Sequence, residues 1–186
     1  MCKSLSLVVE DVLSDSTLRV ILNNINPQIK IAATHGLQGN GYIRRKISGF
    51  NRSSRGQPFL VLTDLDNGIC ASQLIQDWLP EPRENNLLFR VAVREVETWL
   101  MADRRGIAEF LSIPVNHIPE DVENIQAPKE FLMNAARRSS KRTIRDDIPP
   151  RLNSTAKTGP NYNGALIRFL SWDIGIFPAP PITRPA

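Results

Sequence analysis

Strand-like apolar runs alternate with helical patterns along the first half of the chain. The strand-like runs cover residues 5–9, 28–34, 59–63 and 87–93. Helices are predicted over 14–25, 42–48 and 70–79, and again from Arg94 onward, where Val96, Trp99 and Leu100 have helical spacing. Strands that alternate with helices are typical of an α/β fold. We therefore expect a Rossmann-like domain with about four mainly parallel strands and helices on both faces of the sheet.

The pattern weakens after residue 111, where Pro114, Pro119 and Pro128 divide the chain into short pieces. We expect one helix from Pro128 to about Arg138, a loop over 139–160 and a last helix over 162–170. Several prolines indicate an extended tail over the final residues. The predicted organisation is an α/β domain at 1–111 and a helical and loop extension at 112–186 packed on it.

Composition narrows the class of protein. Of the 186 residues, 41% are hydrophobic and 23% are charged, which excludes a wholly disordered chain or a fibre. No apolar run approaches the roughly 20 residues that cross a bilayer, and the first residues do not resemble a signal peptide. The two cysteines form no zinc-like cluster. We expect a cytoplasmic protein without a membrane partner or a disulfide framework.

The net charge of +4 is unevenly distributed. Two basic runs contain the candidate nucleic-acid-binding residues, which are Arg44, Arg45, Lys46, Arg137, Arg138, Lys141 and Arg142. Clusters of this kind favour a phosphate-bearing partner, although a solvated surface without a ligand is the alternative for each run.

Acidic residues follow three of the four predicted strands. Glu10 closes the first strand, Asp64 and Asp66 follow the third, and Glu97 lies just beyond the fourth. The carboxyl ends of parallel strands meet at one edge of a sheet, which is where ligands usually bind. Hard cations such as Mg²⁺ and Mn²⁺ prefer oxygen ligands, so these carboxylates are candidate metal ligands.

Each of these acids also has a purely structural interpretation. Asp and Glu residues after strands often cap the next helix or accept hydrogen bonds from turn amides. Glu97 has the further alternative of an ion pair with Arg94.

Two other features have ordinary structural explanations. The turn with Gly36, Gly39 and Gly41 lacks the GK[ST] ending of a Walker loop, so a connecting turn is favoured over a nucleotide cradle. His35 and His117 are isolated, so we expect surface or packing roles for both.

The acidic segments resemble a known family. The chain resembles the Toprim domain of topoisomerases, primases and OLD-family nucleases in three features. These are Glu10 after a first strand, Asp64-x-Asp66 after a later strand, and the alternation of strands and helices. The segment 94–103, with its Arg-Glu-x-Glu-x-Trp-Leu-x-Ala-Asp pattern, is similar to a family of uncharacterised Toprim-related bacterial proteins, domain-of-unknown-function family 4276. The resemblance covers about residues 5–111.

The resemblance implies roles for particular residues. Glu10 would be a general acid/base or metal ligand, Asp64 and Asp66 a metal-binding pair, and Glu97 a further ligand. Toprim proteins usually place glycine after the glutamate, whereas this chain has Asp11, which either alters the turn or adds a ligand.

The implied activity is Mg²⁺- or Mn²⁺-dependent phosphodiester chemistry on nucleic acid, with a role in defence against phage or mobile DNA. We do not expect a topoisomerase, because a nucleophilic-tyrosine domain would not fit beside this one in 186 residues.

Three functions therefore remain from the sequence. The first is a metal-dependent nuclease or related phosphoryl-transfer enzyme. The second is a receiver-like phospho-acceptor domain, which would need a lysine after a fifth strand that the sequence does not show. The third is a non-catalytic nucleic-acid-binding module. The sequence leaves open whether the substrate is DNA, RNA or a small nucleotide, and whether a protein partner or a second copy completes the site.

Overall fold

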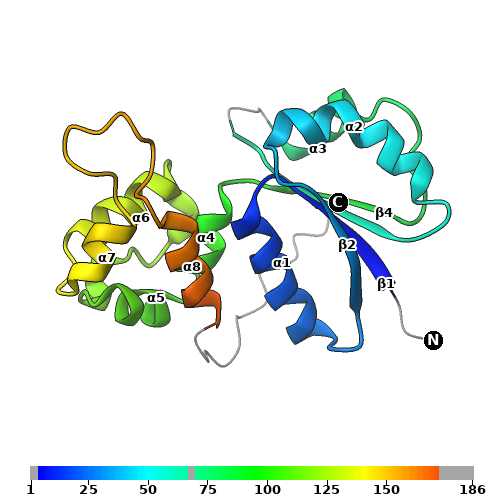
Figure 1. Ribbon diagram of the computed structural model, residues 1–186. Coiled ribbons are helices and arrows are strands. Elements are labelled where there is room, and N and C mark those ends of the chain that lie inside the picture. Colours follow the sequence, from blue (N-terminus) through cyan, green and yellow to red (C-terminus); the bar gives the residue numbers. More distant parts are fainter. Residues whose placement is uncertain (1–3, 67–69, 172–186) are drawn as a thin grey trace. The chain divides into compact units, whose positions relative to one another are not determined.

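The computed structural model describes residues 4–66 and 70–171. The chain forms two compact units, Met1–Val96 and Glu97–Ala186 (Figure 1). The sequence pattern places a boundary after residue 111, whereas the structure divides the chain between Val96 and Glu97.

The first unit alternates strands and helices from its first element to its last. Its elements are β1 (Ser4–Val9), α1 (Val12–Ile25), β2 (Lys30–Gly36), α2 (Asn40–Ser53), β3 (Phe59–Asp64), α3 (Ala71–Trp78) and β4 (Leu87–Ala92). All paired strands are parallel, and their order in the sheet is β2-β1-β3-β4. Helix α1 covers one face, and α2 and α3 cover the other (Figure 1). The predicted α/β fold is therefore confirmed.

The strand order creates a topological switch point between β1 and β3. From β1 the chain moves outward to β2, and from β3 it moves in the opposite direction to β4. Strands β1 and β3 are direct neighbours, with Val8 opposite Val61. In open α/β sheets, the crevice at such a switch point is the usual ligand site.

A hydrophobic core fixes α2 and α3 against the sheet. Val8, Val61 and Phe89 project from three neighbouring strands, and Ile43 and Ile47 project from α2 at a spacing of four residues. All five are almost fully buried. Burying a side chain such as that of Phe89 contributes about 1.5–3 kcal/mol to stability.

His35 has the predicted packing role. Its ring lies 5.5 Å from that of Phe50 and 5.9 Å from that of Phe59, measured between ring centroids.

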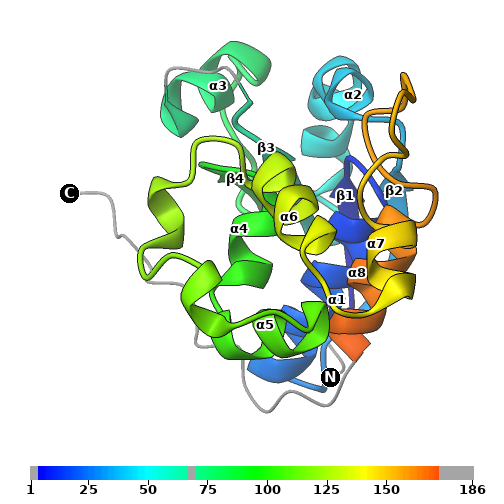
Figure 2. The same cartoon turned by 90° about the vertical axis from the view of Figure 1, so that its left-hand side faces the viewer.

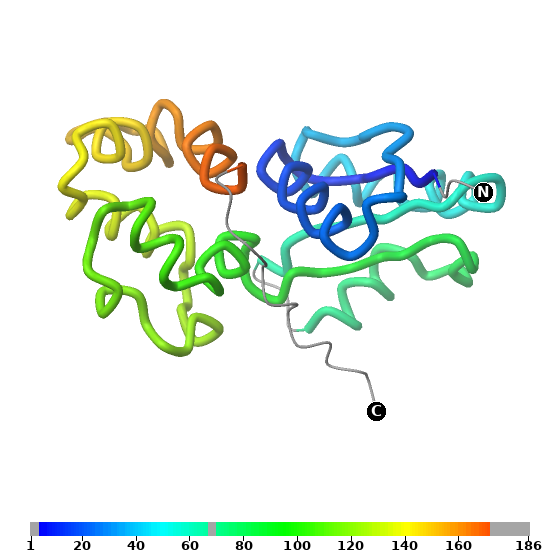
Figure 3. Tube along the Cα trace, turned by 90° about the horizontal axis from the view of Figure 1, so that it is seen from below, coloured from blue at the N-terminus to red at the C-terminus, as the bar shows by residue number. Residues whose placement is uncertain are grey.

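The second unit is helical. Helix α4 (Val96–Met101) starts at its border, and the remaining elements are α5 (Arg104–Leu111), η1 (Val115–His117), η2 (Val122–Asn124), α6 (Pro128–Arg137), α7 (Arg142–Asp147) and α8 (Tyr162–Ser171). Figure 2 shows the helices α4 to α8 grouped together, and Figure 3 traces them in order from green through yellow to orange. The predicted helices over 128–138 and 162–170 correspond to α6 and α8.

Contacts within the second unit explain why α5 and all of α4 except its first residue belong to that unit. The ring of Phe110 on α5 lies 5.4 Å from that of Phe169 on α8, and Phe169 is fully buried. Leu132 on α6 and Leu166 on α8 are also fully buried. Residues 97–111 therefore share a hydrophobic core with the later helices, which no local pattern in the sequence reveals.

The loop predicted over 139–160 is wrong in part, because it contains α7. This helix has six residues, and only Ile144 among them is buried. One apolar residue cannot produce a visible helical period. Backbone hydrogen bonds hold the residues that follow α7. For example, the Gly159 N–H donates to the Ile148 carbonyl at 2.9 Å. The proline-rich tail lies outside the described residues.

The helices of the described chain are shorter than the roughly 20 residues that a membrane-spanning helix needs. The longest helices of the described chain, α1 and α2, have 14 residues each. Among the described residues, no helix has the length and apolar character required to cross a bilayer.

Candidate functional site

Glu10 lies at the switch point, immediately after β1, and is bonded to the end of β3. The Thr63 hydroxyl donates a hydrogen bond to Glu10 Oε1, and the Asp64 backbone N–H donates to the same oxygen at 2.9 Å. Among the described residues, no hydrogen bond reaches Oε2. One carboxylate oxygen is therefore fixed by the neighbouring strand, while the other keeps its lone pairs for a ligand.

The environment of Glu10 disfavours its charge. Burial raises the pKa of this carboxyl above its usual value, and hydrogen bonds from Thr63 and Asp64 partly oppose that effect. The nearby carboxylates of Asp66 and Asp11 raise the pKa further. A cation at this position would offset both the burial and the repulsion.

Asp66 is tied to the start of α2. The Asn40 Nδ2 group donates to Asp66 Oδ2 at 2.6 Å, and Asn40 is the first residue of that helix. Asp66 is exposed and has a left-handed φ of 48°. This bond joins the segment after β3 to the start of α2, the helix that follows β2, so the chain beyond a third strand contributes to the same edge.

The loop after β2 runs directly against the end of β1. The Leu37 N–H donates to the Val9 carbonyl and the Gly39 N–H donates to the Glu10 carbonyl, both at 2.9 Å. Gly36 has a φ of 97°, and a Cβ atom at this position would lie 2.2 Å from the Val9 carbonyl oxygen. The glycine at 36 is therefore required by the close approach of two backbone segments, as expected of a connecting turn.

Asp11 has a structural role. Its side chain accepts a hydrogen bond from the Ser14 N–H at 2.8 Å and caps the N-terminus of α1. A cap of this kind stabilises a helix by about 1 kcal/mol. The residue that follows Glu10 is therefore the N-cap of α1.

The structure brings Glu10, Asp64 and Asp66 to one edge of the sheet. In the described part of the chain, no group of three or more His, Cys, Asp or Glu side chains is arranged to hold a metal ion. Mg²⁺ is commonly held by one or two carboxylates, with waters and phosphate oxygens completing the shell. The donor set of Glu10 and Asp64 consists of hard oxygens and fits that mode of binding.

Glu97 belongs to the second unit, and two residues of that unit hold it. The Tyr162 hydroxyl donates to Glu97 Oε1 at 2.8 Å, and Lys129 Nζ lies 3.5 Å from the same oxygen. The Glu97 side chain is only 3% exposed. These contacts connect α4, α6 and α8, and sequence reasoning missed both partners because they lie far away in the chain. A metal-binding role for Glu97 stays a prediction.

The first basic run lies on the outer side of α2. Arg44, Arg45 and Lys46 are exposed, whereas Ile43 and Ile47 on the same helix are buried in the core. The helix thus presents three positive charges to solvent and begins at Asn40, the residue bonded to Asp66.

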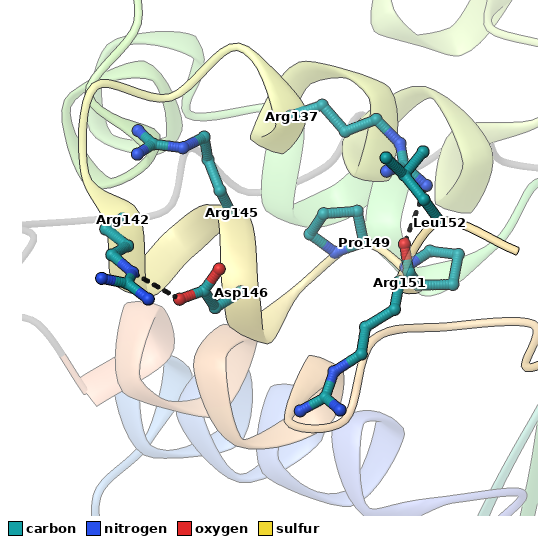
Figure 4. A pocket seen from close by; sticks show the side chains of 8 residues that line it. Arg137, Arg142, Arg145, Asp146, Pro149, Arg151 and Leu152 are labelled. Carbon is teal, nitrogen blue, oxygen red and sulfur yellow. Dashed lines mark hydrogen bonds and ion pairs between the residues drawn. The ribbon is translucent and has the colours of Figure 1, made fainter. Parts of the chain in front are cut away.

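The second basic run contributes to an open hollow of about 560 Å³ (Figure 4). We call it the arginine hollow, and its lining residues are Arg137, Arg142, Arg145, Asp146, Pro149, Pro150, Arg151 and Leu152. The sequence analysis names Arg137 and Arg142 as candidate binding residues, whereas Arg145 and Arg151 belong to the same basic run but are not among those candidates. Of the other predicted binding residues in this run, Arg138 and Lys141 are exposed and do not line the hollow.

Comparisons with known proteins find similar solved structures but no matching family model or curated sequence. No protein-family model and no curated protein sequence matches the chain, so membership of the Toprim-related family is not confirmed. Two solved structures of the C-terminal region of the OLD protein of Xanthomonas campestris pv. campestris are similar. The first has a TM-score of 0.41 and 14% identity, covering 89% of this chain and 93% of that one. The second has a TM-score of 0.38 and 13% identity, covering 90% and 92%. At these values the similarity carries no information on function.

Proposed function

We propose that the protein is a Mg²⁺- or Mn²⁺-dependent nuclease, or a related phosphoryl-transfer enzyme that acts on nucleic acid. The observation that carries the proposal is the Glu10 carboxylate, which is bonded across the switch point to the end of β3 and has a raised pKa. A carboxylate with a raised pKa at the switch point of a parallel sheet is typical of functional sites. The resemblance of residues 7–10 and 61–66 to Toprim segments supports the same chemistry, and a role in defence against foreign DNA rests on that resemblance.

Glu10 and Asp64 would hold the metal, with Asp66 as a further ligand on the same edge and Glu97 as an additional candidate. When bound, the metal supplies charge neutralisation for the phosphate and activation of water.

The chain's own residues prepare this site. The Thr63 hydroxyl and the Asp64 N–H fix Oε1 of Glu10, which orients Oε2 for a ligand or a proton. Because burial raises its pKa, Glu10 is a stronger base than an ordinary carboxylate and is better suited to accept a proton from water. The exposed charges of Arg44, Arg45 and Lys46 would attract a polyanionic substrate to the same unit.

The receiver-like alternative is not favoured. Its lysine would follow a fifth strand, whereas the sheet in the described residues has four strands and ends at β4.

The test is cleavage by the purified full chain. Supercoiled plasmid, single-stranded DNA and RNA are incubated with Mg²⁺, Mn²⁺ or EDTA, and the products are separated on gels. We expect metal-dependent cleavage of at least one substrate, and a loss of about 100-fold or more in Asp64→Asn, since metal ligands of this kind are essential. The matched control is Asp77→Asn, which removes an exposed carboxylate of α3 whose partner is Gln73.

Absence of cleavage with all three substrates by a chain with a native circular dichroism spectrum would refute the catalytic proposal. Metal-independent nucleic-acid binding without cleavage would instead support the binding-module alternative.

A further inference from the structure

The arginine hollow in the second unit has an excess of positive charge. Four arginines line it, opposed by one acid, Asp146. Among the described residues, the only ion pair inside it joins Arg142 Nε to Asp146 Oδ2 at 3.2 Å. The lining therefore carries three positive charges that no acidic residue of the hollow offsets.

Two of the guanidinium groups are held by neutral acceptors. Arg137 Nη2 donates to the Pro150 carbonyl at 3.0 Å. Arg145 Nη1 donates to the carbonyls of Ser139 and Ser140 at 2.6 Å and 3.0 Å. A carbonyl oxygen positions a guanidinium without cancelling its charge, and each guanidinium has five N–H donors, so further donors remain for a ligand. Arg137 and Arg145 are thus oriented in advance, which lowers the entropic cost of binding an anion.

Arg151 differs from the other three arginines. It is exposed, and within the described part of the chain its side chain makes no hydrogen bond or ion pair, although its backbone carbonyl accepts one from the Ser154 N–H. Its guanidinium is therefore available to a ligand.

The hollow also has an apolar surface. Pro149, Pro150 and Leu152 line it, and Leu152 is 86% exposed. Figure 4 shows Arg142 and Arg145 on one side of the Pro149 ring and Arg137 on the other, beside Leu152. The Arg151 side chain extends away from all three (Figure 4). The positive groups are spread around an apolar centre and do not converge on one point.

We propose that the arginine hollow binds the phosphodiester backbone of single-stranded nucleic acid. Separated guanidinium groups match successive phosphates of a chain better than one free phosphate ion. Arginine forms paired hydrogen bonds with phosphate oxygens, and the prolines and Leu152 offer apolar contact to sugars and bases between them. A single strand can bend into a hollow, whereas the phosphates of a duplex lie on a convex surface. The proposal extends beyond the metal site and does not depend on catalysis.

Fluorescence anisotropy with a 5′-labelled 12-residue oligothymidylate, in EDTA and at several salt concentrations, tests this inference. Arg151→Gln is the primary variant, because its side chain holds no other part of the protein. We expect binding to weaken about three- to tenfold and the salt slope to fall by about 1, as for loss of one phosphate contact. Arg145→Gln/Arg151→Gln should weaken binding further.

The matched control is Arg138→Gln, which removes an equal charge from the same basic run outside the hollow. It should change the dissociation constant less than twofold. Asp64→Asn should bind the oligothymidylate as tightly as the wild type in EDTA. This result would show that binding at the hollow is independent of the proposed metal site.

Four results would overturn the inference. Equal weakening in Arg138→Gln and Arg151→Gln would show diffuse attraction without a defined site. Competition by inorganic phosphate or thymidine monophosphate, at equal phosphate concentration, would show a small-anion site. Equal competition by poly-glutamate would show a site for acidic peptides, and tighter binding of a duplex of the same length would exclude the single-strand assignment.

Discussion

The chemistry of the first unit depends on how the single side chain of Glu10 is held. Two hydrogen-bond donors on the neighbouring strand β3 fix one of its carboxylate oxygens. Burial and the carboxylates of Asp66 and Asp11 make the charged form of Glu10 unfavourable. The same residue is therefore well positioned and electrostatically strained in the metal-free chain.

Glu10→Gln should reveal this strain as a pH-dependent difference in stability. An amide oxygen can still accept the bonds from Thr63 and Asp64, so the fold should be retained. In the wild type, burial raises the folded-state pKa of Glu10 above its usual 4.5. Protonated Glu10 therefore contributes stability that is fully present below pH 4.5 and is lost as the pH rises through the raised pKa.

In EDTA, the melting temperature of Glu10→Gln relative to the wild type should thus increase from pH 4 to pH 7.5. Thermal unfolding followed by circular dichroism measures it, with Asp77→Asn as the surface-carboxylate control. A wild type that gains stability over Glu10→Gln across this range would show that the Glu10 charge is favourable in the fold.

Most helices and strands of the first unit, which position Glu10, were predicted from the sequence. Where the structure differs from the prediction, the difference has a physical cause. The continuous apolar run of β3 and the helical spacing in α1 identified both elements. Helix α2 extends to Ser53, beyond the predicted 42–48, because Asn51 occupies a buried position where the pattern shows only polar residues. The Asn51 side chain is satisfied there by the Pro82 carbonyl and the Glu84 N–H, at 3.0 and 2.9 Å. A polar residue with distant partners cannot be recognised as buried from periodicity.

Gly36 and Gly49 provide a matched pair of substitutions that tests the loop after β2, which lies next to Glu10. Gly36→Ala places a Cβ against the Val9 carbonyl at a φ of 97°, so the first unit should lose about 2 kcal/mol or more. Gly49 lies within α2 with no atom within 4 Å of an added Cβ, so Gly49→Ala should gain about 0.5–1 kcal/mol. Urea unfolding measures both. A Gly36→Ala variant as stable as the wild type would show that the loop does not need this close approach.

At the scale of the molecule, each unit combines a polar site with its own hydrophobic core. Strand-end reasoning found Glu10, Asp64 and Asp66 because the topology of a parallel sheet places them at one edge. It could not find Thr63 and Asn40, whose roles depend on particular hydrogen bonds. The arginine hollow was predictable only as a basic run, since the folding of residues 137–152 decides which arginines face it. Glu97 was grouped with the metal ligands by sequence, yet its bonds to Tyr162 and Lys129 are those of a buried residue that joins helices.

The central claim is that Glu10 and Asp64 bind a divalent cation, and calorimetric titration of Mn²⁺ into the full chain tests it most directly. The wild type should show one saturable site, which Asp64→Asn and Glu10→Gln should weaken about tenfold or more, because each removes an oxygen ligand or its charge. Asp77→Asn should bind like the wild type. No saturable binding, or equal binding by the wild type and both site variants, would contradict the claim.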